Sequence, residues 1–179
     1  RVSDVGWLEE QSLFDLMWVY MEKANNIITG WEYDIRAAES QQLTRYREGG
    51  FFGWHSDGPS DNLSTYDFPE NKFLNGHVRK LSGNVVLNDD FEGGDFEFAF
   101  LKADNLNSEN YGQEDSTMVN GRPAIEMRDG KQYGDGDFKP DPIEPLTNIT
   151  KPLDEHPTMG TVLIFPSYVN HRVMPVTKG

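Results

Sequence analysis

The chain has 179 residues, and its 16 Lys and Arg against 30 Asp and Glu give a formal net charge of -14. That charge argues against a nucleic acid partner, because binding to a phosphate backbone depends on neutralising cations. Cysteine is absent, so disulfides and thiolate metal sites are excluded, and no apolar run reaches membrane-spanning length. We therefore expect one cytoplasmic domain spanning residues 1–179, with no membrane partner.

The first predicted element is a helix over about residues 7–24. Its apolar residues recur at spacings of three, four and seven positions, with polar residues mostly opposite. This stripe indicates a helix that packs on the outside of a sheet. After it, alternation over 31–35 predicts a strand. A second strand is predicted at 41–46, joined to the next stretch by a hairpin at the glycine pair 49–50.

The stretch YREGGFFGWHSD, residues 46–57, puts an imidazole and a carboxylate two residues apart. In a strand, residues i and i+2 point to the same face, so His55 and Asp57 stand side by side with Gly53, while Phe52 points the other way. Such a pair supplies half of a metal site. An isolated HxD is more often a surface pair at a strand end, because so short a motif recurs by chance.

The strongest candidate for a third ligand is His171, in GTVLIFPSYVNHRVMPV, an apolar run that predicts strand, turn and strand. A lone histidine on an apolar face is more often a core residue than a ligand. Two histidines and one carboxylate on one face of an ion are, however, the arrangement of non-haem Fe(II) oxygenases. The combination with His55 and Asp57 therefore favours a metal site.

Between these blocks, residues 59–78 are polar and predict a loop beside the site. Strands are predicted over 78–89 and 91–101, with Phe96 and Phe98 on a buried face and Glu97 and Ala99 on a partly solvated one. Residues 102–157 are rich in Asn, Asp, Gly and Pro and predict an insertion, with one hairpin at residues 129–130.

The succession RYREGGFFGWHSD, RKLSGNVVLND with FEGGDFEF, and GTVLIFPSYVNHRVMPVTKG resembles the iron(II)- and 2-oxoglutarate-dependent dioxygenases, nearest to prolyl 4-hydroxylase-like bacterial and phage members. The resemblance implies a mainly β fold with flanking α-helix, a double-stranded β-helix or cupin-like jelly roll with the N-terminal helix packed outside. It implies that His55, Asp57 and His171 hold Fe(II) and that Tyr46 hydrogen-bonds 2-oxoglutarate. O2 is the further cosubstrate, and ascorbate serves as reductant.

One position departs from the family pattern. The basic residue that pairs with the far carboxylate of 2-oxoglutarate usually lies ten positions after the second histidine, whereas this chain ends eight positions after His171. We expect that residue beyond Gly179, with Lys178 or Arg79 as weaker substitutes.

The resemblance implies hydroxylation of an unactivated C–H bond, with release of succinate and CO2. The expected substrate is a prolyl residue in a peptide or protein, and the alternative is a free amino acid or small metabolite. A non-catalytic cupin-like module that binds a metal or sugar is the alternative from another class. The presence of Asp57 argues against a halogenase, which needs the carboxylate position vacant for chloride. The oligomeric state is left open.

Overall fold

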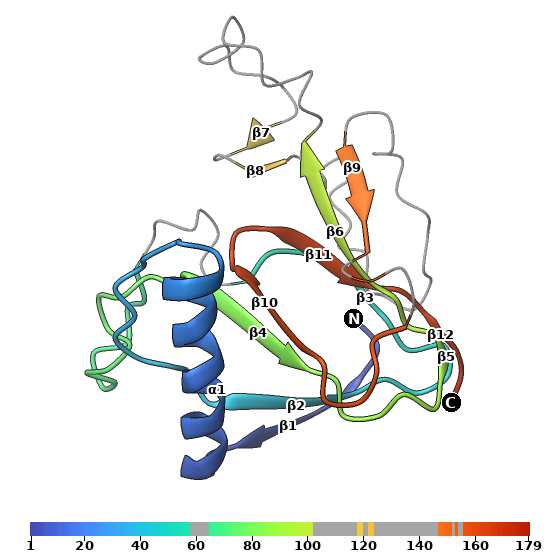
Figure 1. The fold of residues 1–179 in the computed structure, drawn as a ribbon, viewed down its shortest axis with the longest axis horizontal. Helices are drawn as coiled ribbons and strands as arrows, with labels where there is room; N and C mark the ends of the chain where they lie inside the picture. The colour runs from blue at the N-terminus through green and yellow to red at the C-terminus, as the bar shows by residue number, and fades with distance from the viewer. Residues whose placement is uncertain (58–64, 102–117, 120–121, 124–146, 152, 154–155) are drawn as a thin grey trace, which may run out of the picture.

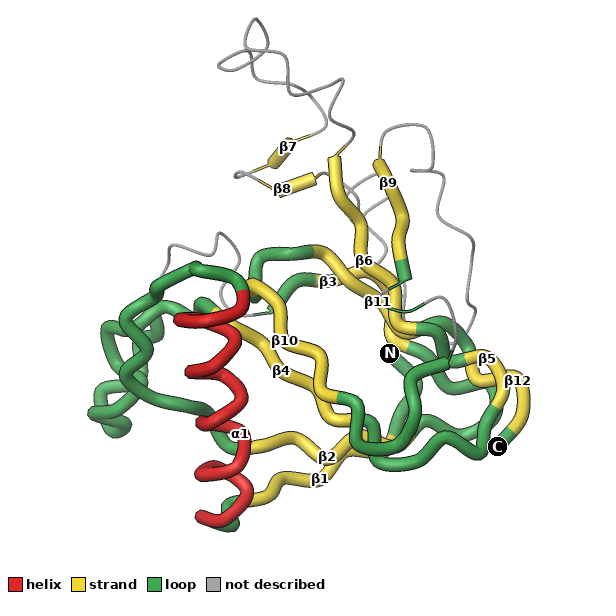
Figure 2. Tube along the Cα trace, in the orientation of Figure 1, coloured by secondary structure: helices red, strands yellow, loops and turns green. Residues whose placement is uncertain are grey.

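The computed structural model describes residues 1–57, 65–101, 118–119, 122–123, 147–151, 153 and 156–179. These residues form one α-helix, one π-helical turn and twelve strands, so the fold is mainly β with a flanking helix, as predicted (Figure 2). In chain order the elements are β1 (Asp4–Leu8), α1 (Gln11–Lys23), the π-helical turn η1 (Ala24–Ile28), β2 (Gln41–Arg45), β3 (Phe52–His55), β4 (Leu81–Val85), β5 (Glu92–Gly93), β6 (Phe96–Leu101), β7 (Met118–Val119), β8 (Arg122–Pro123), β9 (Thr147–Thr150), β10 (Val162–Pro166), β11 (Asn170–Val173) and β12 (Val176–Lys178).

All the paired strands run antiparallel. The largest sheet has the order β3-β11-β6-β9, while β10 pairs with β4, β1 with β2, β5 with β12 and β7 with β8. The consecutive strands β10 and β11 therefore belong to different sheets, and the chain passes between them at residues 167–169. This arrangement agrees with a jelly roll, and closure into a double-stranded β-helix stays a prediction.

The helix lies outside β4 (Figure 1). A Cβ added at Gly83 of β4 would lie 2.5 Å from Cε of Met21 and 3.2 Å from Cε of Met17, so the missing side chain gives the helix its close approach. The predicted stripe is confirmed in part, since Leu13, Met17 and Met21 are half-buried. Two flexible methionine side chains thus fill the space that a side chain at residue 83 would occupy.

The helix begins later than predicted. Residues 4–8 form β1 and pair with β2, where Trp7 lies opposite Gln42 and is 64% exposed. The apolar spacing at Trp7 fits a helix and a strand equally well, and pairing with a distant segment decides the outcome.

The strand predicted at 31–35 is wrong. The side-chain amide of Asn25, which is fully buried, donates to the Tyr33 carbonyl oxygen at 2.8 Å and accepts from the Tyr33 backbone nitrogen at 3.0 Å. These bonds satisfy the backbone that a neighbouring strand would otherwise satisfy. The predicted hairpin at 49–50 is also wrong, because β2 pairs with β1 and β3 pairs with β11.

Both faces of the four-stranded sheet are buried near β11. On the inner face, Phe96 and Phe98 pack against Phe165 of β10, with ring centroids 5.7 and 5.0 Å from it. On the outer face, Glu97 and Ala99 are 7% and 5% exposed, so the prediction of a partly solvated face is wrong. The alternation identified the two faces correctly but not what covers the outer one.

The predicted insertion contributes a strand to this sheet, since β9 pairs with β6 from Phe98↔Thr150 to Leu101↔Thr147. The hairpin predicted at residues 129–130 lies outside the described residues. Among the helices that the structure describes, none is long and apolar enough to span a membrane.

Candidate metal centre

Two histidines meet across adjacent strands. His55 ends β3 and His171 lies in β11, and the register of the two strands places them directly opposite each other. Their ring centroids are 4.1 Å apart. Opposed positions in an antiparallel pair point to the same face of the sheet, so the strand pairing brings together two residues 116 positions apart in sequence.

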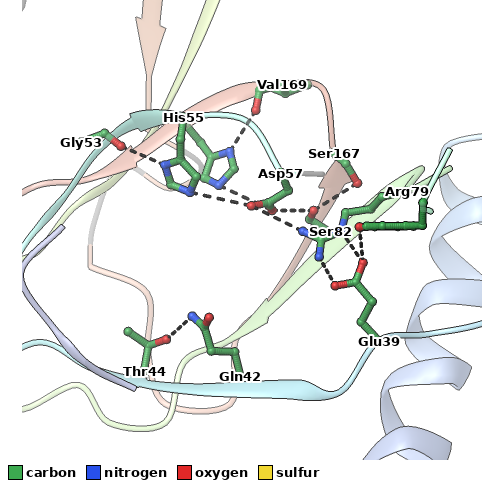
Figure 3. Close-up of polar contacts among 12 residues, drawn as sticks. Glu39, Gln42, Thr44, Gly53, His55, Asp57, Arg79, Ser82, Ser167 and Val169 are labelled. Carbon is green, nitrogen blue, oxygen red and sulfur yellow. Dashed lines mark hydrogen bonds and ion pairs between the residues drawn. The ribbon is translucent and has the colours of Figure 1, made fainter. Parts of the chain in front are cut away.

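Asp57 completes a three-residue cluster just after β3. Its Oδ1 lies 3.8 Å from Nε2 of His55, and its Oδ2 lies 3.8 Å from Nε2 of His171. One ligand atom from each of the three residues lies within 4.8 Å of the others. Figure 3 shows His55 and Asp57 turned toward each other at this point. The three residues singled out from the sequence are therefore neighbours in space.

Backbone carbonyls fix how both imidazoles present their nitrogens. Nδ1 of His55 lies 2.8 Å from the Gly53 carbonyl oxygen, and Nδ1 of His171 lies 2.9 Å from the Val169 carbonyl oxygen. A carbonyl oxygen only accepts, so in each neutral ring Nδ1 carries the proton and Nε2 keeps its lone pair. Both lone pairs are thus available on the Asp57 side, which is the state a metal ligand requires.

A β-bulge shapes the His55 side of the cluster. His171 pairs with His55, but Val173 pairs with Phe52, so β3 has one residue more than β11 over this stretch. The extra residue brings Phe52 onto the face of His55, where the rings stack with centroids 3.6 Å apart. The prediction that Phe52 points the other way is therefore wrong, because it assumed an unbroken pleat.

Burial keeps both imidazoles neutral. It lowers the pKa of His55 to about 4, with the neighbouring His171 as the second cause, and it also lowers the pKa of His171. His171 is 3% exposed, and the rings of Phe96 and Phe165 lie 5.3 and 4.8 Å from its own. In such apolar surroundings the charged form is disfavoured, so at neutral pH neither ring needs to lose a proton before it binds a cation.

Asp57 is held by one hydrogen bond from β4 to its carboxylate and by one from its backbone to the turn after β10. Oγ of Ser82 in β4 donates to Oδ2 at 2.6 Å, and the Asp57 backbone nitrogen donates to the Ser167 carbonyl oxygen at 2.9 Å. Nη1 of Arg79 lies 3.7 Å from Oδ1, too far for a hydrogen bond. Oδ1 is therefore the oxygen with the greater free capacity to bind a cation.

Arg79 is engaged on its other side. Its Nε donates to Oε1 of Glu39 at 2.8 Å, Nη2 contacts Oε2 of the same carboxylate, and the Tyr66 hydroxyl donates to Oε1 at 2.5 Å. This network ties residues 39 and 66, from two loops, to Arg79, which precedes β4. Figure 3 shows Arg79 between Glu39 and Asp57. The bidentate pair balances the Arg79 charge next to the cluster.

The remaining candidates differ in burial and in their partners. Burial raises the pKa of Tyr46 to about 12, with further influence from the charges of Arg1 and Asp57, so its hydroxyl keeps its proton at neutral pH and lies within electrostatic reach of the centre. Lys178 is exposed and pairs with Glu92 at 2.7 Å. His77 is exposed, and its Nδ1 lies 3.2 Å from the Asn75 carbonyl oxygen.

Sequence reasoning missed Ser82 and Glu39. Ser82 carried a signal, since it is a polar residue within the predicted strand 78–89, which begins near Arg79. Glu39 carried none, because it precedes β2 in a stretch whose path depends on Asn25.

The donor set fits a first-row metal ion. Two neutral imidazoles and one carboxylate on one face, with no thiolate, are the facial arrangement of non-haem Fe(II) oxygenases. The fold and the cluster thus define a mainly β protein with a candidate iron centre.

The sequence model of the 2OG-Fe(II) oxygenase superfamily matches residues 41–179, and the chain belongs to this superfamily, whose members use Fe(II), 2-oxoglutarate and O2. Neither the curated proteins nor the solved structures contain a match to the chain.

Proposed function

We propose that the chain is an Fe(II)- and 2-oxoglutarate-dependent hydroxylase, with His55, Asp57 and His171 as the metal ligands. The observation that carries the proposal is the convergence of two unprotonated Nε2 atoms and one carboxylate within 4.8 Å, beside apolar rings. Buried polar groups without partners are costly, so this convergence favours a bound cation.

The bound metal and keto acid supply the oxidising chemistry, in which O2 is consumed, 2-oxoglutarate is split into succinate and CO2, and a C–H bond is hydroxylated. His55, Asp57 and His171 would hold the metal, which would leave room for the keto acid and O2. The Phe96, Phe98 and Phe165 rings keep water from the His171 side of the centre.

Tyr46 is the proposed hydrogen-bond donor to 2-oxoglutarate. Its raised pKa means that it donates rather than carries charge at neutral pH. Lys178 and Arg79 are each paired with a glutamate, which favours a different cation as the partner of the distal carboxylate. Loss of a direct ion pair to the distal carboxylate would lower 2-oxoglutarate affinity by about 10-fold or more. On this proposal, Lys178→Met and Arg79→Met each lower the affinity by less than that.

A prolyl residue in a peptide or protein is the proposed substrate, and it rests on the family resemblance of the motifs. A free amino acid or small metabolite is the second candidate, and ascorbate is the proposed reductant. The net charge of -14 favours a neutral or cationic substrate over an anionic one.

The test is succinate formation by the purified chain with Fe(II), 2-oxoglutarate, ascorbate and O2, in the presence and absence of proline-containing peptides. We expect succinate formation that depends on Fe(II) and increases with the peptide, and no turnover by Asp57→Ala. Peptide-independent turnover that rises with a free amino acid would move the substrate to the second candidate. Metal binding without any succinate would favour a non-catalytic cupin-like module.

A further inference from the structure

Two serine hydroxyls from different elements form a chain of hydrogen bonds that ends at Asp57. Oγ of Ser82 lies 2.6 Å from Oδ2 of Asp57 and 3.2 Å from Oγ of Ser167. Ser167 is fully buried and lies in the turn between β10 and β11, four positions before His171. The chain therefore joins the turn that leads into one candidate ligand to the carboxylate of another.

The direction of the two bonds follows from the number of protons. A carboxylate has none to give, so Ser82 must donate its single hydroxyl proton to Asp57. Ser82 then has only acceptor capacity left for Ser167, and the Ser167 hydroxyl donates to it. Bonds that run in one direction polarise each other, which strengthens the charge-assisted bond at the carboxylate.

The backbone of Ser167 holds the same arrangement. Its carbonyl oxygen accepts from the Asp57 backbone nitrogen at 2.9 Å, and its backbone nitrogen donates to the Lys80 carbonyl oxygen at 3.0 Å. Residue 57 is thus tied to the turn by its backbone and to β4 by its side chain. The Ser82 hydroxyl thereby restricts rotation of the carboxylate.

We propose that Ser82 is a positioning residue for the metal centre. Its hydroxyl engages Oδ2 of Asp57, so that Oδ1 is directed to the ion as a single ligand atom. The inference rests on the proposed function, because it requires that Asp57 bind a metal. Ser167 supports Ser82 from behind, through its buried hydroxyl. Loss of an outer hydrogen bond to a metal ligand typically lowers metal affinity by about 10- to 100-fold.

The chain provides a matched control beside the site. Ser56 lies between His55 and Asp57 in sequence, and its hydroxyl is buried with no hydrogen-bond partner among the described residues. Ser56→Ala removes a buried hydroxyl of the same kind, from a residue directly beside two of the ligands, without removing a contact to Asp57. Ser82→Thr keeps the hydroxyl and serves as the conservative variant.

The wild type, Ser82→Ala, Ser82→Thr and Ser56→Ala are titrated with Mn²⁺ under anaerobic conditions. Their Co²⁺ absorption spectra and metal-free melting temperatures are measured as well. We expect Ser82→Ala to bind Mn²⁺ about 10- to 100-fold more weakly, with an altered Co²⁺ spectrum. Ser82→Thr and Ser56→Ala should stay within about 3-fold of the wild-type affinity. The melting temperature shows whether Ser82→Ala is folded, and the comparison is made below it.

The outcomes separate this inference from the proposed function. Tight Mn²⁺ binding by the wild type with equal binding by Ser82→Ala would overturn the role of Ser82 and leave the proposed function standing. Equal losses in Ser82→Ala and Ser56→Ala would also overturn it, since a local packing defect would then explain both. No binding by the wild type would overturn the proposed function and this inference together.

Discussion

The two faces of the sheet around β11 both bury polar side chains, but they treat them differently. On the outer face, the buried side chains of Arg172 and Glu97 bond to each other at 2.7 and 2.8 Å, and the guanidinium lies 4.4 Å from the Trp54 ring centre. On the inner face, the Nε2 atoms of His55 and His171 point with Asp57 at one shared position.

A structural polar cluster and a functional one differ in whether their own groups satisfy each other. On the outer face positive and negative groups satisfy each other, so nothing further is needed. On the inner face the bonded nitrogens are those that point away from the cluster, and three acceptors face each other. The two Nε2 atoms and Oδ1 of Asp57 converge with no hydrogen-bond donor between them among the described residues, which favours a bound cation more than burial or polarity alone would.

The largest effect is expected on the outer face. Glu97→Ala leaves the Arg172 charge buried without its carboxylate, and we expect a loss of about 3–5 kcal/mol in the free energy of unfolding. Mn²⁺ affinity below the melting temperature should stay near the wild-type value, because the metal cluster lies on the opposite face. Lys178→Ala, which breaks an exposed pair, is the control and should cost less than about 1 kcal/mol. A loss of Mn²⁺ binding in folded Glu97→Ala would show that the two faces are coupled.

The inner face should give the metal-free protein its acid sensitivity. Burial holds the pKa of His55 at about 4, whereas the ordinary value is 6.5, so between these pH values the unfolded chain binds more protons than the folded one. The free energy of unfolding is therefore expected to fall as the pH falls from 6.5 to 4, by about 3 kcal/mol for His55, with a further loss from His171.

Denaturant titrations of the metal-free chain at several pH values measure this slope. His171→Ala should reduce it, whereas His77→Ala, which removes an exposed imidazole, should leave it unchanged. A free energy of unfolding that is constant from pH 6.5 to 4 would mean that the imidazoles are not buried as neutral groups.

Smaller effects on stability and Mn²⁺ affinity are expected from one aromatic substitution on each face. Phe52→Leu removes the ring stacked on His55, and Trp54→Phe weakens the contact under Arg172, each at a cost of about 1 kcal/mol. Only Phe52→Leu should lower Mn²⁺ affinity, because the lost ring orients a ligand. Titration with Mn²⁺ measures this difference. Equal affinities in the two variants would mean that Phe52 contributes to stability only and does not orient His55 for metal binding.

The sequence was sufficient to single out the three clustered side chains and insufficient for their surroundings. His55, Asp57 and His171 could be found because a spacing of two in a strand and the order of the motifs are local signals. The bulge that moves Phe52 to the other face has no such signal, since it depends on the register between β3 and β11. In the same way, residues 7–8 belong to β1 and not to the start of the predicted helix, because their partner strand β2 lies far along the chain.

The central claim is that the three converging side chains hold one metal ion. Anaerobic equilibrium dialysis of the metal-free chain against Fe²⁺ tests it most directly, with Asp57→Ala and His171→Ala beside the wild type. We expect one ion bound per wild-type chain and an affinity at least about 100-fold lower in each variant, because each removes one of three ligands. One ion bound with undiminished affinity by both variants would contradict the account.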